Sequence, residues 1–476
     1  MQQPTPPRPP RAHFSGIGGT AMVAGARLAL EAGWNIRGSD LPLYPPTSEM
    51  VKALGVPVAT EYAAANLDWD PDVVIIGNAL SRGNPEVEAA LERRLHIASL
   101  PEWLKDVVLR RRRPIAICGT HGKTTTTALT AFLLDRAGAA PGFLIGGEPL
   151  DFPHSARLSD EGSPFVIEGD EYDTAFFDKR AKFLHYLPEI AVVTSIEFDH
   201  GDIYDDLAGI ERAFRLMLRQ LPQTGSLAIC ADSPEALALR PHAPCRTLTY
   251  GFAQNADFRG EIAHVASGLL SLRTWRHGKR WGEFRVPLTG RHNAQNALAA
   301  LAVASIIGCA PDALRQAMPD FKGVRRRMEI FAEHNGITFV DDFAHHPTAI
   351  RETIAAARMR WPAARLWAIF EPRSNTTVTN RFQGELREAF AQADIIRIGP
   401  LHRAERLPED QRLDRTTLTQ ELQSSGRDAQ TVDAIEEIVA GILEKAQTGD
   451  VVLFLSNGAF GGIFNRVKQA LESAPE

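Results

Sequence analysis

The chain has 476 residues, of which 44% are hydrophobic and 23% are charged, and its formal net charge is −6. This composition is typical of a globular protein and excludes a disordered chain. The mild acidity argues against sequence-independent nucleic-acid binding, which needs a basic surface, and the length favours about three domains.

The start of the chain and its cysteines indicate a cytoplasmic protein. Residues 1–11 are rich in proline and lack an apolar segment, so we expect a disordered tail rather than a secretory signal. No run approaches the roughly 18 apolar residues of a membrane span, and we expect no membrane contact. The 4 cysteines have no metal or redox spacing, which is typical of a reduced compartment.

The first predicted domain, 12–112, alternates strands and helices, the order that builds a parallel sheet. The predicted elements are strands near 13–15, 34–38 and 73–76 and helices over 21–32 and 85–94. The first strand runs into Gly16-Ile17-Gly18-Gly19, which together with Ala21 fits the fingerprint of a diphosphate-binding loop. Asp40 follows the second strand, where a ribose-binding acid belongs. The loop alone fits NAD as well as a nucleotide sugar.

The second predicted domain, 113–323, opens with a strand, a glycine loop and a helix. The strand 115–118 runs into Gly119-Thr120-His121-Gly122-Lys123-Thr124-Thr125, and a helical pattern continues to about residue 137. Unpaired N–H groups at such a helix start attract phosphate. A standard loop of this kind has a further glycine at the position of Ile117, so we interpret the stretch as a shortened ATP-binding loop.

Side chains of this loop have distinct predicted roles. Lys123 can reach the β- and γ-phosphates, and Thr124 or Thr125 can offer a hydroxyl to Mg²⁺. Cys118 directly precedes the loop, so we expect thiol reagents to affect nucleotide binding.

Carboxylates follow two further predicted strands of this domain, at the sheet edge where ligands bind. They are Glu168, Asp170, Glu171 and Asp173 after the strand 165–167, and Glu197 and Asp199, with His200, after the strand 191–196. Carboxylate oxygens are the ligands that Mg²⁺ prefers. The sequence therefore predicts a metal site here, with a solvated acidic loop and a structural histidine as alternatives.

The remaining pattern completes an α/β fold class with three domains. Alternating stretches over 269–275 and 281–286 predict antiparallel hairpins, and a helix is expected over 293–307. The third predicted domain, 324–476, has strands expected at 337–340, 366–370, 395–398 and 451–455. We expect Rossmann-like domains at both ends and, between them, a P-loop ATPase-like domain with added antiparallel strands.

These motifs together resemble the Mur ligase family. The segments similar to its motifs are the shortened ATP loop 119–125, the acidic motif 168–171, the metal-site pair 199–200, the adenine-binding segment 290–297, and the third-domain start at Arg326, Arg327 and 341–347. The resemblance covers nearly the whole chain after the proline-rich tail.

The resemblance implies ATP-driven amide formation on UDP-N-acetylmuramate through an acyl phosphate, with Mg²⁺ as the metal and ATP as co-substrate. The stretches 171–180 and 371–376 are most similar to members that attach the recycled tripeptide L-Ala-γ-D-Glu-meso-diaminopimelate. The first glycine loop is equally similar to members that attach L-alanine. A non-catalytic nucleotide-sugar sensor and an NAD-dependent oxidoreductase are more distant alternatives.

The resemblance also implies roles for individual residues. Catalytic roles fall to Lys123, Glu168 and His200, and metal binding to Thr124, Glu168 and His200. ATP binding falls to Gly119, Thr120, His121, Gly122, Lys123, Thr124, Thr125, His292, Asn293, Asn296, Arg327 and Asp342. UDP-sugar binding falls to Gly16, Ile17, Gly18, Gly19, Ser39, Asp40 and Asn78, and peptide binding to Arg373, Ser374 and His346.

Overall fold

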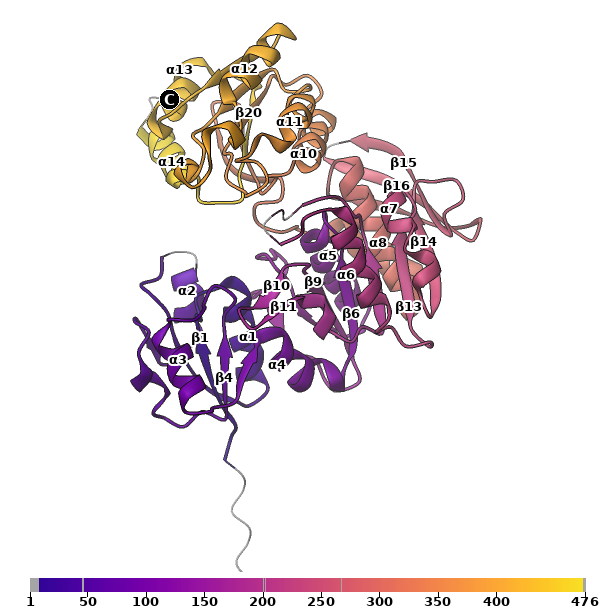
Figure 1. Ribbon diagram of the computed structural model, residues 1–476. Helices are drawn as coiled ribbons and strands as arrows, with labels where there is room; N and C mark the ends of the chain where they lie inside the picture. The colour runs from indigo at the N-terminus through magenta and orange to yellow at the C-terminus, as the bar shows by residue number, and fades with distance from the viewer. Residues whose placement is uncertain (1–7, 45–46, 200, 202, 267, 474–476) are drawn as a thin grey trace, which may run out of the picture.

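The computed structural model describes residues 8–44, 47–199, 201, 203–266 and 268–473, and it forms three successive α/β domains (Figure 1). The predicted fold class is confirmed. Residues 1–7 of the predicted tail lie outside the described residues. Arg11, at the end of that predicted tail, instead begins the first strand, and Arg8 pairs with Asp72 at 2.8 Å. Residues 8–11 of the predicted tail are therefore ordered, which differs from the prediction.

The first domain is a parallel sheet in the order β3-β2-β1-β4-β5. Its strands are β1 (Arg11–Ser15), β2 (Asn35–Ser39), β3 (Val58–Ala59), β4 (Val73–Ile76) and β5 (Ile97–Ser99). Its helices are α1 (Thr20–Glu31), α2 (Thr47–Lys52), α3 (Pro85–Glu92) and α4 (Leu100–Val107). Since β1, β2 and β4 run parallel, the segments that follow them meet at one edge, and the Gly16 loop lies there.

The central domain has the strand order β17-β16-β15-β14-β13-β12-β6-β9-β7-β8. Its strands are β6 (Arg113–Cys118), β7 (Gly142–Leu144), β8 (Ala156–Arg157), β9 (Pro164–Gly169), β12 (Ile190–Val193), β13 (Ser226–Cys230), β14 (Arg246–Gly251), β15 (Phe258–Ala266), β16 (Leu269–Arg276) and β17 (Lys279–Val286). The antiparallel pairing of β16 with β17 confirms the predicted hairpin. A separate hairpin joins β10 (Asp173–Ala175) to β11 (Asp178–Ala181).

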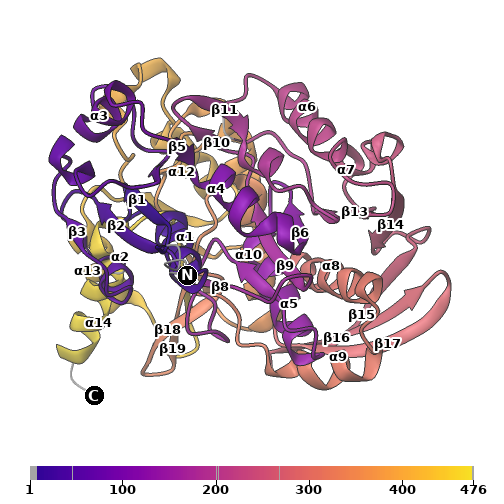
Figure 2. The same cartoon turned by 90° about the horizontal axis from the view of Figure 1, so that it is seen from below.

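Helices of the central domain pack on this sheet and on each other. They are α5 (Lys123–Arg136), α6 (Leu207–Leu218), α7 (Pro234–Leu237), α8 (Arg291–Ile307) and α9 (Pro311–Ala317). α8 is alanine-rich and almost entirely buried, and it packs against α5. A helix that is apolar all round belongs inside a protein, so α8 forms a rigid support behind α5. Figure 2 shows a contact between the first and central domains, where α1 lies beside β8.

The third domain has the strand order β18-β19-β23-β20-β21-β22, in which only the β18–β19 pairing is antiparallel. Its strands are β18 (Glu329–His334), β19 (Ile337–Asp342), β20 (Leu366–Phe370), β21 (Ile395–Ile398), β22 (Asp428–Thr431) and β23 (Val451–Leu455). Its helices are α10 (Pro347–Arg360), α11 (Gln383–Ala389), α12 (Arg415–Ser424), α13 (Ile435–Lys445) and α14 (Ile463–Ser473). The domain boundaries near residues 112 and 323 stay predictions.

None of the helices in the described part of the chain combines the length and apolarity needed to cross a bilayer.

Candidate active site

The glycine loop between β6 and α5 has a backbone shape that only glycine allows. Gly119 has a φ of +132° and Gly122 a φ of +79°, both in the region that other residues rarely adopt. A Cβ at Gly119 would lie 2.1 Å from Thr194 Oγ1, and a Cβ at Gly122 would lie 2.2 Å from Asn296 Oδ1. The loop therefore packs closely against the segment after β12 and the start of α8, and it leads into the first turn of α5, whose N–H groups can bind phosphate.

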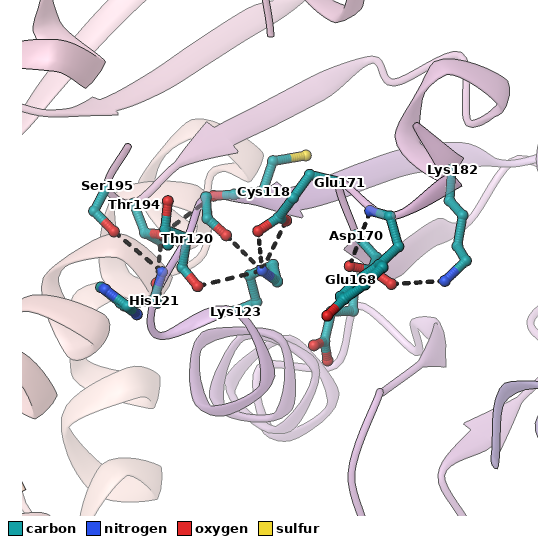
Figure 3. Close-up of polar contacts among 12 residues, drawn as sticks. Cys118, Thr120, His121, Lys123, Glu168, Asp170, Glu171, Lys182, Thr194 and Ser195 are labelled. Carbon is teal, nitrogen blue, oxygen red and sulfur yellow. Dashed lines mark hydrogen bonds and ion pairs between the residues drawn. The ribbon is translucent and has the colours of Figure 1, made fainter. Parts of the chain in front are cut away.

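Lys123 in this loop is largely buried and is held by a carboxylate (Figure 3). Its Nζ donates to both oxygens of Glu171, at 3.0 and 2.8 Å, and to the Gly119 carbonyl at 2.7 Å. The side chains are only 13% and 2% exposed. Burial alone would lower the pKa of Lys123, but the charges of Glu171 and Asp170 outweigh it and raise that pKa. The ammonium is therefore charged at neutral pH.

Glu168, at the end of β9, lies beside the first turn of α5. Its carboxylate accepts from Thr124 Oγ1 at 2.9 Å and from the Gly146 N–H at 2.8 Å. Burial raises the pKa of Glu168, although the Lys123 charge and the two hydrogen bonds oppose that shift. Thr124 and Glu168 bring hard oxygen atoms together beside the phosphate cradle, and this donor set suits Mg²⁺. His200, the third predicted metal ligand, lies outside the described residues.

The segment after β12 connects the glycine loop to the third domain. Thr348 Oγ1 at the start of α10 donates to Glu197 Oε2 at 2.7 Å, and Thr376 Oγ1 donates to Asp199 Oδ1 at 2.7 Å. On the other side, the Glu197 N–H donates to Thr120 Oγ1 at 2.9 Å. Two hydroxyl groups of the third domain thus contact the segment that supports the ATP-binding loop.

Glu197 also lies beside two histidines that were predicted as site residues. His121 Nε2 is 3.3 Å from Glu197 Oε2, and His346 Nδ1 is 3.8 Å from the same atom. Burial would raise the pKa of Glu197, but the hydrogen bonds from His121 and Thr348 help to lower it to about 2. Burial lowers the pKa of His346 to about 4, so its ring is neutral at pH 7.

The start of α8 places the predicted adenine-binding residues against the glycine loop. Asn293 Nδ2 donates to the Thr289 carbonyl at 2.9 Å, and Asn296 Nδ2 donates to Asn293 Oδ1 at 3.2 Å. His292 lies one residue into the helix, and burial together with the nearby His121 lowers its pKa to about 4. This surface presents a neutral imidazole and amide groups, which suits an uncharged base better than a phosphate.

Arg327 reaches from the third domain to the glycine loop. Its Nη2 donates to Thr124 Oγ1 at 3.4 Å, and its guanidinium lies over the Phe343 ring at 4.6 Å. Asp342 accepts the N–H groups of Met328 and Ala344, at 2.8 and 2.9 Å, and so connects the residue after Arg327 to the turn after β19. Burial lowers the pKa of Arg327, with Asp342 opposing the shift.

The first glycine loop is held by hydrogen bonds to Asp40, the acid that was predicted to bind ribose. Asp40 Oδ2 accepts the Gly18 N–H at 2.7 Å, and Oδ1 accepts the Tyr62 hydroxyl at 2.8 Å. The Ser39 carbonyl accepts the Gly16 and Ile17 N–H groups at 2.8 and 3.1 Å. α1 follows Gly19 without a side-chain cap, so its first N–H groups are available to a diphosphate.

Two predicted site residues of the first domain have side chains directed elsewhere. The Ser39 hydroxyl is fully buried and donates to Glu86. Asn78 Nδ2 donates to Asp173 Oδ1 at 3.1 Å and thereby links the first domain to β10 of the central domain. Their UDP-sugar roles stay predictions.

The predicted peptide-binding residues lie in two segments of the third domain that contact each other at Ser374 and His345. Arg373 and Ser374 follow β20, and the Arg373 side chain is 33% exposed, 3.5 Å from Glu371 and 3.4 Å from His402. The Ser374 hydroxyl is paired with Thr377 Oγ1 at 2.8 Å. His346 also lies beside the ATP-binding loop, where the centre of its ring is 4.9 Å from that of the His121 ring.

Three family models match the chain almost from end to end. Their descriptions are "Mur ligase family, catalytic domain" over residues 11–112, "Mur ligase middle domain" over 117–304 and "Mur ligase, glutamate ligase domain" over 326–458. The chain belongs to the Mur ligase family. The predicted family is thereby confirmed, and the loop 119–125 lies at the start of its middle domain.

Individual relatives of this Mur ligase span its full length. It is 40% identical over 473 residues, 98% of this chain and 99% of the relative, to UDP-N-acetylmuramate–L-alanyl-γ-D-glutamyl-meso-2,6-diaminoheptandioate ligase of Escherichia coli. It is 34% identical over 466 residues, 94% of this chain and 96% of the relative, to UDP-N-acetylmuramate–L-alanine ligase of Roseiflexus.

Solved structures of both kinds share the fold. A murein peptide ligase from Psychrobacter arcticus matches with a TM-score of 0.72 and 34% identity, covering 98% of this chain and 99% of that one. A UDP-N-acetylmuramate–alanine ligase from Thermotoga maritima matches with a TM-score of 0.80 and 25% identity, covering 98% and 100%.

Sequence reasoning missed several residues that organise the site of this Mur ligase. They are Thr348 and Thr376 beside the ATP loop and Glu86 beneath the first glycine loop, whereas Glu171 and Glu197 were predicted only as carboxylates of a metal site and not as partners of the loop. Glu171 and Glu197 did carry a signal, since both closely follow predicted strands that end at the ligand-binding edge. The two threonines and Glu86 carried none, because their partners lie far away in the sequence.

Cys118 differs from the expectation for a reactive thiol. Its side chain is fully buried, and burial raises its pKa well above the usual range. Because the thiolate is the nucleophile, we expect iodoacetamide to leave Cys118 unmodified in the folded ligase while the partly exposed Cys245 and Cys309 react. Mass spectrometry of the labelled protein tests this, with denatured protein as the control. Labelling of Cys118 before Cys245 would contradict the expectation.

Proposed function

We propose that the chain is an ATP-dependent ligase that joins UDP-N-acetylmuramate to the tripeptide L-Ala-γ-D-Glu-meso-diaminopimelate. The observation that carries the reaction type is the charged, buried Lys123 in a glycine cradle next to Thr124 and Glu168. The acceptor follows from the relative named for this tripeptide, at 40% identity over 98% of the chain. The product returns a recycled peptide to peptidoglycan synthesis.

The first step brings two anions together. The lactyl carboxylate of UDP-N-acetylmuramate attacks the γ-phosphate of ATP, which gives an acyl phosphate and ADP. Lys123 lowers the barrier by placing a positive charge where negative charge develops, and the N–H groups at the start of α5 hold the phosphates. Bound Mg²⁺, for which Thr124 and Glu168 are the proposed ligands, supplies further charge neutralisation.

The first and third domains contribute positioning. The Gly16–Gly19 loop holds the UDP diphosphate away from the reacting carboxylate, so binding energy from the nucleotide orients the muramate. The third domain brings Arg327 to Thr124 and supplies the peptide site. The peptide amine then attacks the acyl phosphate carbon, an amide bond forms and inorganic phosphate leaves.

One assay separates this proposal from its closest competitor, a UDP-N-acetylmuramate–L-alanine ligase. The competitor is supported by the first glycine loop and by a relative at 34% identity. ADP and phosphate release are measured with ATP, Mg²⁺ and UDP-N-acetylmuramate, and with either the tripeptide or L-alanine as acceptor. We expect kcat/KM to be at least about tenfold higher for the tripeptide. The reverse preference would identify an alanine ligase, and no release with any amine would contradict ligase activity.

Arg373 is our candidate for binding a carboxylate of the peptide. It follows the carboxyl end of β20, a central strand of the third domain's sheet. Its guanidinium is partly exposed and has N–H groups that can bind a planar carboxylate through two hydrogen bonds. We expect Arg373→Ala to raise the apparent KM for the tripeptide by about tenfold while leaving that for ATP unchanged. Arg387→Ala, an exposed arginine of α11, is the matched control. An effect of Arg373→Ala confined to ATP would contradict this role.

A further inference from the structure

A buried carboxylate lies beneath the first glycine loop, where neither the sequence motif nor the proposed reaction calls for a charge. Glu86, near the start of α3, is 0% exposed. Its Oε2 accepts from the Ser15 and Ser39 hydroxyls at 2.6 and 2.5 Å, and its Oε1 accepts from Asn66 Nδ2 at 2.6 Å. His13 Nε2 lies 3.3 Å from Oε2 as well.

The carboxylate is ionised despite its burial. Burial would raise the pKa of Glu86, but the hydrogen bonds from His13, Ser15, Ser39 and Asn66 outweigh it and lower that pKa to about 2. Glu86 also lies in the first turn of α3, where the helix dipole favours a negative charge. A buried charge without such compensation is costly, so these four donors are what keeps Glu86 charged in the interior.

The two serines that donate to Glu86 are the last residues of their strands, directly before the ligand-binding edge of the sheet. Ser15 is the last residue of β1 and precedes Gly16, and Ser39 is the last residue of β2 and precedes Asp40. The Ser39 carbonyl accepts the Gly16 and Ile17 N–H groups, and Asp40 accepts the Gly18 N–H. One carboxylate oxygen therefore ties together the two strand ends that shape the glycine loop.

We propose that Glu86 is a positioning residue for the UDP-sugar site. By holding the Ser15 and Ser39 hydroxyls, it keeps the Gly16–Gly19 loop in its diphosphate-binding shape before the ligand arrives, so less binding energy is lost to ordering the loop. Ser39 then acts from below the site rather than by contact with the sugar nucleotide. The proposal rests on the UDP-sugar role of this loop.

The first test replaces Glu86 with glutamine, which has nearly the same size. An amide has one oxygen acceptor and no charge, so it cannot accept from Asn66 and both serines as the carboxylate does. We expect Glu86→Gln to raise the Kd of UDP-N-acetylmuramate, measured by calorimetry, by about tenfold. The KM for this substrate should rise equally, with the KM for ATP unchanged. Glu88→Gln is the control, because Glu88 lies on the same helix, is partly exposed and pairs with Arg82.

A second set of variants separates positioning from general stability. Ser15→Ala and Ser39→Ala each remove one donor but keep the carboxylate, and each should raise the Kd of UDP-N-acetylmuramate about threefold to tenfold. Combined with Glu86→Gln, each should add less than its single effect, because the two changes break the same interaction. Thermal unfolding is followed for every variant.

The outcomes divide clearly. A lower melting temperature of Glu86→Gln with an unchanged Kd for UDP-N-acetylmuramate would show a purely structural residue and overturn the proposal. Additive effects of Glu86→Gln and Ser15→Ala on that Kd would overturn it as well. If the unaltered protein does not bind UDP-N-acetylmuramate at all, the proposed function fails first, and that result precedes any variant.

Discussion

Replacement of Lys123 by alanine is expected to lower ligation and ADP release by about 10³-fold, a larger effect than that of any other proposed variant. Lys123 contributes the positive charge proposed to lie beside the γ-phosphate, and its side chain is only 13% exposed, so water replaces it poorly. UDP-N-acetylmuramate binding should be largely retained, because its proposed loop belongs to a different domain. Coupled ADP release and calorimetry with the UDP-sugar measure the two properties separately.

Loss of Lys123 also affects stability, and this needs its own control. Glu171 is 2% exposed and faces the ammonium at 2.8 Å, so removing the cation from this buried pair should destabilise the fold by about 3 kcal/mol. The double variant Lys123→Met with Glu171→Gln removes both charges and should recover most of that stability. We expect it to remain inactive. Activity in the double variant, or turnover by Lys123→Ala near the unaltered level, would contradict the role of Lys123.

Replacement of Glu168 by glutamine is expected to lower kcat by about 10²-fold and to raise the Mg²⁺ concentration needed for half-maximal rate. The amide has no negative charge for the metal, but its oxygen can still accept from Thr124, so the fold should change little. Initial rates over a range of free Mg²⁺, at saturating ATP and UDP-N-acetylmuramate, measure the effect.

Glu189→Gln is the matched control for this experiment. Glu189 directly precedes β12 of the same sheet, is partly exposed and pairs with Arg113 rather than with the ATP loop. Its replacement should leave both kcat and the Mg²⁺ dependence unchanged. A normal Mg²⁺ dependence in Glu168→Gln would remove Glu168 from the proposed metal site, whatever happens to kcat.

The parts of the site that could be predicted from the sequence are local in the chain. The strand, the glycine loop and the start of α5 are covalent neighbours, and left-handed glycines with an adjacent Lys-Thr pair specify one backbone shape. In the structure, Gly119 and Gly122 both adopt positive φ angles. The role of Glu168 could also be predicted from the sequence, because a carboxylate after a buried strand lies at the ligand-binding edge in any parallel sheet.

The contacts that join the domains could not be predicted in the same way. Thr348 and Glu197 are 151 residues apart, Thr376 and Asp199 are 177 apart, and Arg327 and Thr124 are 203 apart. A threonine or arginine in a loop has many possible partners. Which one it meets depends on strand order and on how the three domains pack, and neither follows from local pattern.

By itself, the sequence determined the three-domain α/β class, the ATP loop and the family, since hydrophobic periodicity and short motifs act over a few residues. Only the tertiary structure decided which carboxylate binds Lys123 and that Cys118 is fully buried. It also decided that Ser39 bonds to Glu86 and that Asp40 bonds to the backbone of the first glycine loop. The physical reason is burial. The pKa and the partner of a side chain depend on what surrounds it in space, and residues distant in the sequence supply those surroundings.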